Sequence, residues 1–373
     1  MTSSRISLVM LALAACSDPS QEEPLAPDAS RPDASVHDAS AFDSAPRDAQ
    51  TSDGAIGCPP ARDGRSLDQL VRAIVSNMMT SAGAGSNALM VPSAAARDAF
   101  ADSVVGALSG DLRKACKLPP SYRIVALRDG ADDVLVAAEL DPSGAPAPKT
   151  FWGTYAARSP ATGTRAIVLE APHPLFDTNT AYEARAVFSE ARGDWFLMAG
   201  AHRCANAESA GCDGTTSACG GSSAPYRVSD TAHATKTPFF AVHLALSTKT
   251  DDAFIQLHGN AQACPDALVS DSSGRYSDVS TSARLAAAIE ARGPSVGRCG
   301  LDYPKAGCNL CGTDNVEARA TAGASDACTD KGSMFGRFVH IEQLPSLRQV
   351  PDGGAPKGYQ PVVDAVKATF AVR

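Results

Sequence analysis

Residues 164–191, TRAIVLEAPHPLFDTNTAYEARAVFSEA, join a strand pattern to a helix pattern within one short stretch. An apolar run of strand length ends at Ala171, and a helix is predicted over residues 181–191. Thr180, with a glutamate three residues later, has the form of a capping box and marks the start of that helix. Between the two elements, a pair of prolines flanks His173 and restricts the backbone around its imidazole.

The chain from Cys58 onward repeats this alternation of strands and helices. Helices are predicted over residues 66–80, 93–116, 237–248, 281–292 and 361–372, and strands over residues 121–129, 133–140, 151–159, 164–171, 194–201, 252–259 and 336–344. Strands that alternate with helices favour an α/β fold. We therefore expect residues 58–373 to form one α/β domain, with a three-layer αβα architecture, a mixed, largely parallel sheet and disulfide-containing loops.

The residues before Cys58 are expected to lie outside this domain. Residues 1–15 have the short apolar run and small residues of a secretory signal, too short for a retained spanning helix. The sequence Leu-Ala-Ala-Cys ending at Cys16 resembles a bacterial lipobox, which implies cleavage before this cysteine and its lipidation; an ordinary cleaved signal is the alternative. Residues 16–57, rich in Asp, Ala, Ser and Pro, then form a disordered tether. His37 lies in this tether, and we expect no role for it.

The cysteine count agrees with export. Without Cys16, ten cysteines remain, an even number typical of disulfides in an oxidising compartment. The sequence leaves their pairing open, and the alternative is a zinc knuckle built on Cys308 and Cys311, flanked by Cys299 and Cys328. The net charge is −8, and the chain has no basic stripe with interleaved aromatic residues, so we expect no nucleic-acid partner.

Polar residues end or follow several of the predicted strands. His173 and His202 each come shortly after a strand, whereas His258 and Glu342 lie in the last residues of two later strands. The carboxyl ends of parallel strands border the functional crevice of an open α/β sheet, so we expect these side chains to converge. Converging imidazoles and carboxylates are the ligands that a divalent metal ion requires.

Four segments follow one another along the chain: APHPLFDTNTAYEA (171–184), GAHR (200–203), IQLHG (255–259) and HIEQLPSLR (340–348). This order resembles the zinc-dependent exopeptidase-like fold of the phosphorylase/hydrolase type. Within it, the N-formylglutamate amidohydrolases and the poly-γ-glutamate hydrolases are the most similar, over roughly residues 150–345. The resemblance implies one Zn²⁺ ion per chain and hydrolysis of an amide next to a carboxylate. It does not extend to residues 58–150, whose role stays open.

Carried over position by position, the resemblance assigns the metal ligands to His173, Asp177 and His258. It assigns the general base to Glu342. The acidic ligand of these families is often a glutamate at another spacing, so Glu170 is the alternative to Asp177. Three such ligands leave one position of the zinc ion open for water, whose pKa falls toward about 7.

Further candidates surround this set. We expect Arg203 to bind an oxyanion or a substrate carboxylate, because a guanidinium grips a carboxylate with two bonds. His202 beside it is a second candidate substrate contact. His233 lies in a loop near the same region, and His243 shares a helix face with apolar residues, so that it is either a core residue or part of the site. His340, in a late strand, is expected to be structural.

Together these features predict an extracytoplasmic lipoprotein, in the periplasm or on the cell surface, with the outer membrane favoured over the inner. We expect a zinc-dependent amidohydrolase or peptidase that cleaves an amide bond near a carboxylate in a peptide-like or acyl-amino-acid substrate. The alternatives are a non-catalytic surface binding protein and a structural lipoprotein on the same fold. The sequence contains no Gly-x-Ser-x-Gly elbow, Walker loop or dinucleotide fingerprint, which argues against those three classes.

Overall fold

The structure is a computed structural model that describes residues 58–158, 163–332, 336–350 and 357–373. The predictions for the signal (1–15), the lipidation of Cys16, the tether (16–57) and His37 lie outside the described residues. Within the described ranges, no helix combines the length and the apolar character needed to cross a membrane.

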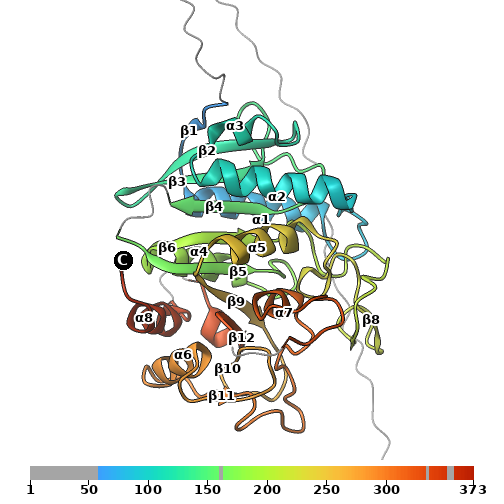
Figure 1. Cartoon of the computed structure of the whole chain (residues 1–373), viewed down its shortest axis with the longest axis vertical. Helices are drawn as coiled ribbons and strands as arrows, with labels where there is room; N and C mark the ends of the chain where they lie inside the picture. The colour runs from blue at the N-terminus through green and yellow to red at the C-terminus, as the bar shows by residue number, and fades with distance from the viewer. Residues whose placement is uncertain (1–57, 159–162, 333–335, 351–356) are drawn as a thin grey trace, which may run out of the picture. The chain divides into compact units, whose positions relative to one another are not determined.

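One sheet contains ten strands: β1 Ala61–Ser66, β2 Tyr122–Asp129, β3 Asp132–Glu139, β4 Thr154–Arg158, β5 Arg165–Ala171, β6 Gly193–Met198, β9 Ala253–Gly259, β10 Ala267–Ser270, β11 Val296–Arg298 and β12 Phe338–Gln343. Their order across the sheet is β1-β2-β3-β4-β6-β5-β9-β12-β10-β11 (Figure 1). Five neighbouring pairs are parallel and four are antiparallel, which confirms the mixed, largely parallel sheet. A separate small sheet pairs β7 Thr215–Thr216 with β8 Ala224–Pro225.

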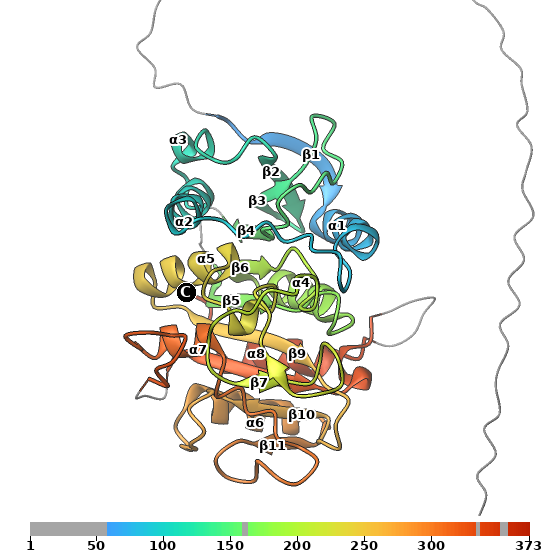
Figure 2. The ribbon, with the colours of Figure 1, turned by 90° about the vertical axis from the view of Figure 1, so that its right-hand side faces the viewer.

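Helices cover both faces of the large sheet, as expected for three layers. They are α1 Leu67–Ser81, α2 Ala94–Leu108, α3 Leu112–Ala115, α4 Thr180–Glu190, α5 Pro238–Lys249, α6 Thr281–Glu290, α7 Val316–Thr321 and α8 Gln360–Thr369. On one face α1 packs against α4, α4 against α8 and α8 against α6, and on the other face α5 packs against both α2 and α7. Figure 2 shows α1 and α4 on one side of the sheet and α2 and α5 on the other.

Residues 58–158 continue the same sheet. β4 pairs antiparallel with β6, so β1 to β4 extend the edge of the central parallel strands. α1 packs against α4 and α2 packs against α5, which places N-terminal helices in both helical layers. Buried side chains from both parts of the chain, such as Phe100, Tyr155 and Phe196, belong to one hydrophobic core. The N-terminal segment, whose role the sequence left open, therefore shares the core of the domain.

Several elements differ from the sequence prediction. The helix predicted over residues 93–116 is broken into α2 and α3, because Gly110 between them adopts a φ of 105°, which an α-helix cannot contain. The sequence pattern does not predict β1, β10, β11 or α7. Each of these has six residues or fewer, too few for a hydrophobic period to be recognised.

The start of α4 also differs from the predicted capping box. The N-cap residue is Asn179, whose φ of 74° lies in the left-handed region and whose side chain makes no capping hydrogen bond. The Thr180 hydroxyl donates to Asp177 O at 2.8 Å. The Glu183 carboxyl accepts from Gln343 Nε2 at 3.0 Å. The capping-box prediction is wrong because Glu183 turns into the protein interior instead of toward the helix N-terminus.

All ten cysteines of the described residues are paired, in the disulfides Cys58–Cys116, Cys204–Cys219, Cys212–Cys328, Cys264–Cys308 and Cys299–Cys311. The prediction of disulfides is confirmed. The zinc-knuckle alternative is wrong, because Cys308 and Cys311 pair with Cys264 and Cys299, and a metal ligand must be a thiolate.

The burial of Glu183 predicts a pH-dependent stability. Burial raises the pKa of this carboxyl to about 8, although the hydrogen bond from Gln343 and the charge of Arg348 lower it. Its ordinary pKa, which applies to the unfolded chain, is 4.5. The folded state therefore keeps a proton that the unfolded state releases, so stability falls as the pH rises between these two values.

We expect the substitution Glu183→Gln to remove this loss of folding stability at higher pH. Relative to the wild type, the free energy of unfolding of the variant should increase by a few kcal/mol between about pH 5 and pH 8. Urea unfolding of both proteins across this range, with disulfides intact, measures the difference. A difference that stays constant across the range would contradict the raised pKa.

Candidate metal centre

The loop after β5 carries two of the predicted metal ligands. His173 stands between Pro172 and Pro174, and the Asp177 backbone N–H donates to His173 O at 2.9 Å, which closes a tight turn. The Thr231 hydroxyl donates to Pro172 O at 2.7 Å and ties this turn to a later loop. His173 and Asp177 are 0% and 2% exposed, so both side chains are held inside the protein.

His258 and Glu342 come from two adjacent parallel strands, where they are directly paired. Gly259 follows His258 and faces the opposite side of the sheet, where a Cβ atom would lie 2.5 Å from the guanidinium carbon of Arg348. A larger residue at that position would require the Arg348 guanidinium to move. Because side chains alternate along a strand, His258 and Glu342 share the face that Gly259 does not use.

Three ligand atoms meet at one point of this face. Asp177 Oδ2 lies 3.2 Å from Nδ1 of His173 and 3.4 Å from Nδ1 of His258. The other ring nitrogens are already bonded: His173 Nε2 lies 2.8 Å from Asp230 Oδ1, and His258 Nε2 lies 2.7 Å from Gln256 Oε1. Ionised carboxylates and amide oxygens only accept hydrogen bonds. We therefore assign the ring protons to Nε2, which leaves both Nδ1 lone pairs facing Asp177.

These three residues, called the triad below, fit a bound metal ion. Neighbouring ligands of a tetrahedral ion with bonds of about 2.0–2.1 Å lie about 3.3 Å apart. The observed spacings of 3.2 and 3.4 Å match this value. All three ligand atoms lie within 4.8 Å of one another. Three ligands leave a fourth position open, as in catalytic metal sites.

The electrostatics of the two histidines differ. Burial lowers the pKa of His258 to about 4, so this ring is neutral at neutral pH. Burial and the charge of Arg203 also lower the pKa of His173, but Asp230 and Asp177 outweigh them, and the net shift is upward. A carboxylate behind a metal-binding histidine raises its basicity in this way.

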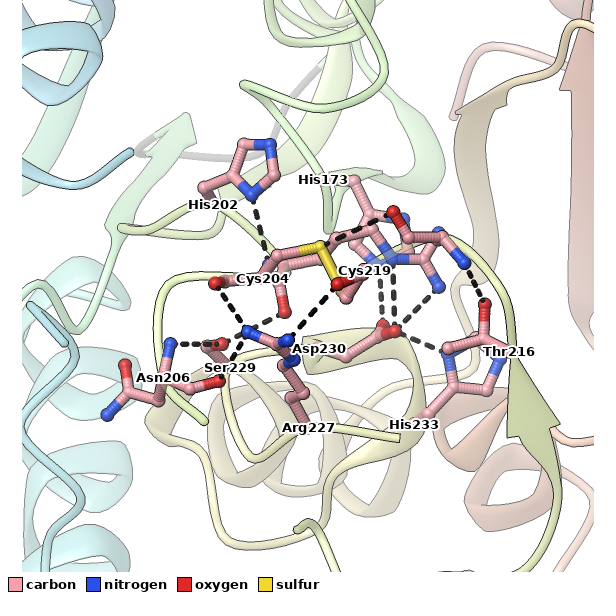
Figure 3. The surroundings of a disulfide bond; sticks show 12 residues. His173, His202, Cys204, Asn206, Thr216, Cys219, Arg227, Ser229, Asp230 and His233 are labelled. Atoms are coloured by element: carbon pink, nitrogen blue, oxygen red, sulfur yellow. Dashed lines mark hydrogen bonds and ion pairs between the residues drawn. A yellow bond between two sulfur atoms is a disulfide. The ribbon is translucent and has the colours of Figure 1, made fainter. Parts of the chain in front are cut away.

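Asp230 bonds to the ring nitrogen of His173 that does not face Asp177, and the sequence did not predict it. Its Oδ1 accepts from His173 Nε2 at 2.8 Å and from His233 Nδ1 at 3.0 Å (Figure 3). Its Oδ2 accepts from Nε and Nη2 of Arg203 at 3.0 and 2.6 Å. Burial opposes the charge of Asp230, but Arg203, His233 and His173 together hold its pKa well below the usual range.

Arg203 is held in place by a disulfide-closed loop. Its guanidinium lies 5.2 Å from the centre of the Phe176 ring, and its side chain is 12% exposed. The next residue, Cys204, is bonded to Cys219, and Arg227 donates to the carbonyl oxygens of both cysteines at 3.1 Å (Figure 3). The loop therefore presents a fixed cation beside the triad.

Glu342, the predicted base, also lies in the site. Its Oε1 is 3.4 Å from Nε2 of His340. His258, His340 and Glu342 form a second group whose ligand atoms lie within 4.8 Å of one another, so His340, expected to be structural, borders the site. Burial and the charge of Asp177 raise the pKa of Glu342 well above its usual value, although Arg203 lowers it.

Glu170, the alternative acidic ligand, lies behind the triad. Its Oε1 is 2.7 Å from His243 Nδ1, and its Oε2 accepts from Gln256 Nε2 at 3.0 Å. Since Gln256 also bonds to His258, a chain of hydrogen bonds runs from His258 through Gln256 and Glu170 to His243. The geometry therefore favours Asp177 as the acidic ligand and places His243 in a buried supporting network.

The two remaining candidates lie at the edge of the site. His202 is partly exposed, its Nδ1 accepts from the Cys204 backbone N–H at 3.0 Å, and its ring lies 5.4 Å from that of Phe176. Among the described residues, it belongs to none of the groups that could hold a metal ion. His233 stacks on Tyr226 with ring centres 3.8 Å apart and reaches the triad through Asp230.

The sequence does carry a signal for the supporting residues that were missed. Asp230 stands three residues before His233, and Gln256 stands two residues before His258. The second spacing places both side chains on one face of a strand. Polar residues at these short spacings from a candidate histidine are therefore worth including in a predicted site.

Comparison with solved structures gives a distant similarity. The chain matches no protein-family model and no curated protein. Among solved structures, it is similar to the crystal structure of N-formylglutamate amidohydrolase from Ralstonia eutropha JMP134, with 13% sequence identity and a TM-score of 0.32. The similarity covers 56% of this chain and 94% of that one. A similarity at this level assigns neither fold nor function to the chain, and the site is interpreted from its own geometry.

Proposed function

We propose that the protein is a zinc-dependent hydrolase that cleaves an amide bond close to a carboxylate. The observation that carries this proposal is the meeting of three possible ligand atoms, Nδ1 of His173, Oδ2 of Asp177 and Nδ1 of His258. Two imidazoles and one carboxylate at tetrahedral spacing suit zinc among the divalent ions. Bound zinc would supply Lewis acidity toward an amide carbonyl and toward water.

Glu342 is the residue proposed to move the proton. Its carboxyl group is paired with His258 across β9 and β12 and is 8% exposed, so it acts in a largely water-shielded site. In its ionised form, which the charge of a bound metal ion would favour, it would take the proton of the attacking water and pass it to the leaving nitrogen. His340, 3.4 Å away, would orient this carboxyl.

Arg203 is the reason for proposing that the substrate carries a carboxylate near the cleaved amide. Its Nε and Nη2 are bonded to Asp230, whereas its Nη1 makes no hydrogen bond to the described residues. A guanidinium nitrogen beside the triad can donate to a carboxylate or to a developing oxyanion. Arg203 would thus hold the substrate, and Asp230 would hold Arg203.

We also propose that the protein works outside the cytoplasm, anchored through a lipidated Cys16. The five disulfides support an oxidising compartment. The lipobox resemblance of residues 13–16 supports the anchor, and an outer-membrane position remains the favoured one. Radiolabelled palmitate incorporated by the wild type but not by a Cys16→Ala variant would test the anchor.

The hydrolytic proposal is tested with purified protein exported through an oxidising compartment. N-formyl and N-acyl amino acids and α- and γ-linked glutamyl peptides are offered, each beside an analogue that lacks the carboxylate. We expect hydrolysis that stops on chelation, returns with zinc, and is at least about tenfold slower for the carboxylate-free analogues. Zinc and ligand binding without hydrolysis would point instead to a binding protein, and a folded protein that binds neither would point to a structural lipoprotein.

A further inference from the structure

We infer that Asn260 recognises a second amide group of the substrate, next to the amide that is cleaved. The substrate is then a chain of at least two amide bonds, not an acyl amino acid with a single one. This inference rests on the proposed hydrolytic function and narrows its substrate class.

The backbone places Asn260 on the same face as the triad. Its N–H donates to Gln343 O at 2.9 Å, the hydrogen bond that closes the Gly259–Gln343 pair at the carboxyl end of β9. The Gly259 position faces Arg348 on the opposite side of the sheet. Asn260 is the first residue after β9, and we infer from the alternation along this strand that its side chain lies on the face of His258 and Glu342, one step nearer the carboxyl edge of the strands.

The side chain of Asn260 is buried without a partner. It is 5% exposed, and neither its Oδ1 nor its Nδ2 makes a hydrogen bond to the described residues. Buried amide groups in folded proteins almost always have partners, because an unmade hydrogen bond in the interior is costly. A carboxamide that lacks both of its partners beside a candidate active site is suited to bind a ligand there.

The loop that carries Asn260 is held rigidly. Cys264, four residues later, is bonded to Cys308, and the Asn309 backbone N–H donates to Gln262 Oε1 at 3.2 Å. Cys299 and Cys311 close the neighbouring loop. These cysteines pack together around Leu268 in a small apolar cluster. The loop is therefore preorganised, so that Asn260 needs little ordering when a ligand binds.

The chemistry of a carboxamide indicates what it binds. Its oxygen accepts and its nitrogen donates, so its full complement is a group with one N–H and one C=O, as in a peptide bond. A carboxylate would use only the donor and leave Oδ1 without a partner. In an acyl amino acid, the single amide is the bond that is cleaved. A second amide, one residue away, exists only in a longer peptide.

Binding is measured in the zinc-loaded Glu342→Gln background, where hydrolysis is blocked. γ-Linked triglutamate, with two amide bonds, is compared with γ-linked diglutamate, with one, by calorimetry. We expect Asn260→Leu to weaken triglutamate binding by about tenfold or more and to leave diglutamate binding unchanged. Equal effects on both peptides, or on neither, would overturn the inference. Zinc content is measured for each variant, so a failure of the metal site is recognised separately.

A second measurement needs no ligand. In otherwise wild-type protein, Asn260→Leu should keep or raise the urea midpoint of unfolding, because it removes an amide that has no partner. The matched control is Asn315→Leu, since Asn315 is also buried but bonds to Gln256 Oε1 at 2.5 Å and to the Ala318 N–H at 2.8 Å. The control should lower the midpoint. A clear loss of stability in Asn260→Leu as well would show that this amide has its partners within the protein and would overturn the inference.

Discussion

Replacing Glu342 with glutamine should lower amide hydrolysis by about 10²–10⁴-fold and leave the zinc content unchanged. Glutamine fills the same space beside His258 and His340, but it cannot take a proton from water. The triad does not include Glu342, because its three ligand atoms come from His173, Asp177 and His258. Steady-state rates and zinc content, measured on the same preparations, give the two readouts.

The matched control is Glu183→Gln. Glu183 is another buried carboxyl group, but it bonds to Gln343, whose side chain lies on the opposite face of β12 from Glu342. This variant should hydrolyse the substrate at the wild-type rate. If Glu342→Gln kept its rate within about threefold, Glu342 would not be the base. If it lost its zinc together with its activity, Glu342 would be a ligand and its assigned role would be wrong.

Replacing Asp230 with alanine should destabilise the protein by about 3–5 kcal/mol and weaken zinc binding by about 10–100-fold. Asp230 is fully buried, and its two oxygens serve Arg203, His173 and His233. Its removal leaves the side chain of Arg203, 12% exposed, without its ion-pair partner. It also frees Nε2 of His173, so that the ring loses both its orientation and its preferred tautomer.

A double variant separates these two effects. Adding Arg203→Met to Asp230→Ala removes the buried charge, so part of the lost stability should return. Zinc affinity should stay low, because His173 still lacks its carboxylate partner. Urea unfolding and competition with a zinc chelator measure the two quantities. An Asp230→Ala protein with wild-type stability and wild-type zinc affinity would contradict the supporting role of Asp230.

The sequence predicts the parts of this molecule that depend on local pattern. The long helices and strands show clear periods, and the rule that parallel strands end at one edge is enough to predict that His173, His258 and Glu342 lie in one region. The prolines around His173 likewise indicate a fixed imidazole. The choice between Asp177 and Glu170 stays open in the sequence, since both acids stand near His173 along the chain.

Other features depend on contacts between distant segments. Asp230 is 57 residues from His173, and nothing local shows that they meet. The five disulfide pairings join segments 12 to 116 residues apart, and several pairings fit the same cysteine spacing. The Thr180 capping box fails for the same reason, because Glu183 gains a partner on β12 that the local sequence does not show. Tertiary contacts decide these details, and they include the residues that support the triad.

Zinc content tests the central claim of a metal centre at His173, Asp177 and His258 most directly. Purified wild-type protein is dialysed against zinc and then against metal-free buffer, beside the three single alanine variants of the triad. Circular dichroism and a thiol assay establish that each protein is folded and oxidised. We expect about one zinc ion per wild-type chain and essentially none in the folded variants. A folded wild type that retains no zinc, or variants that retain as much as the wild type, would contradict the account.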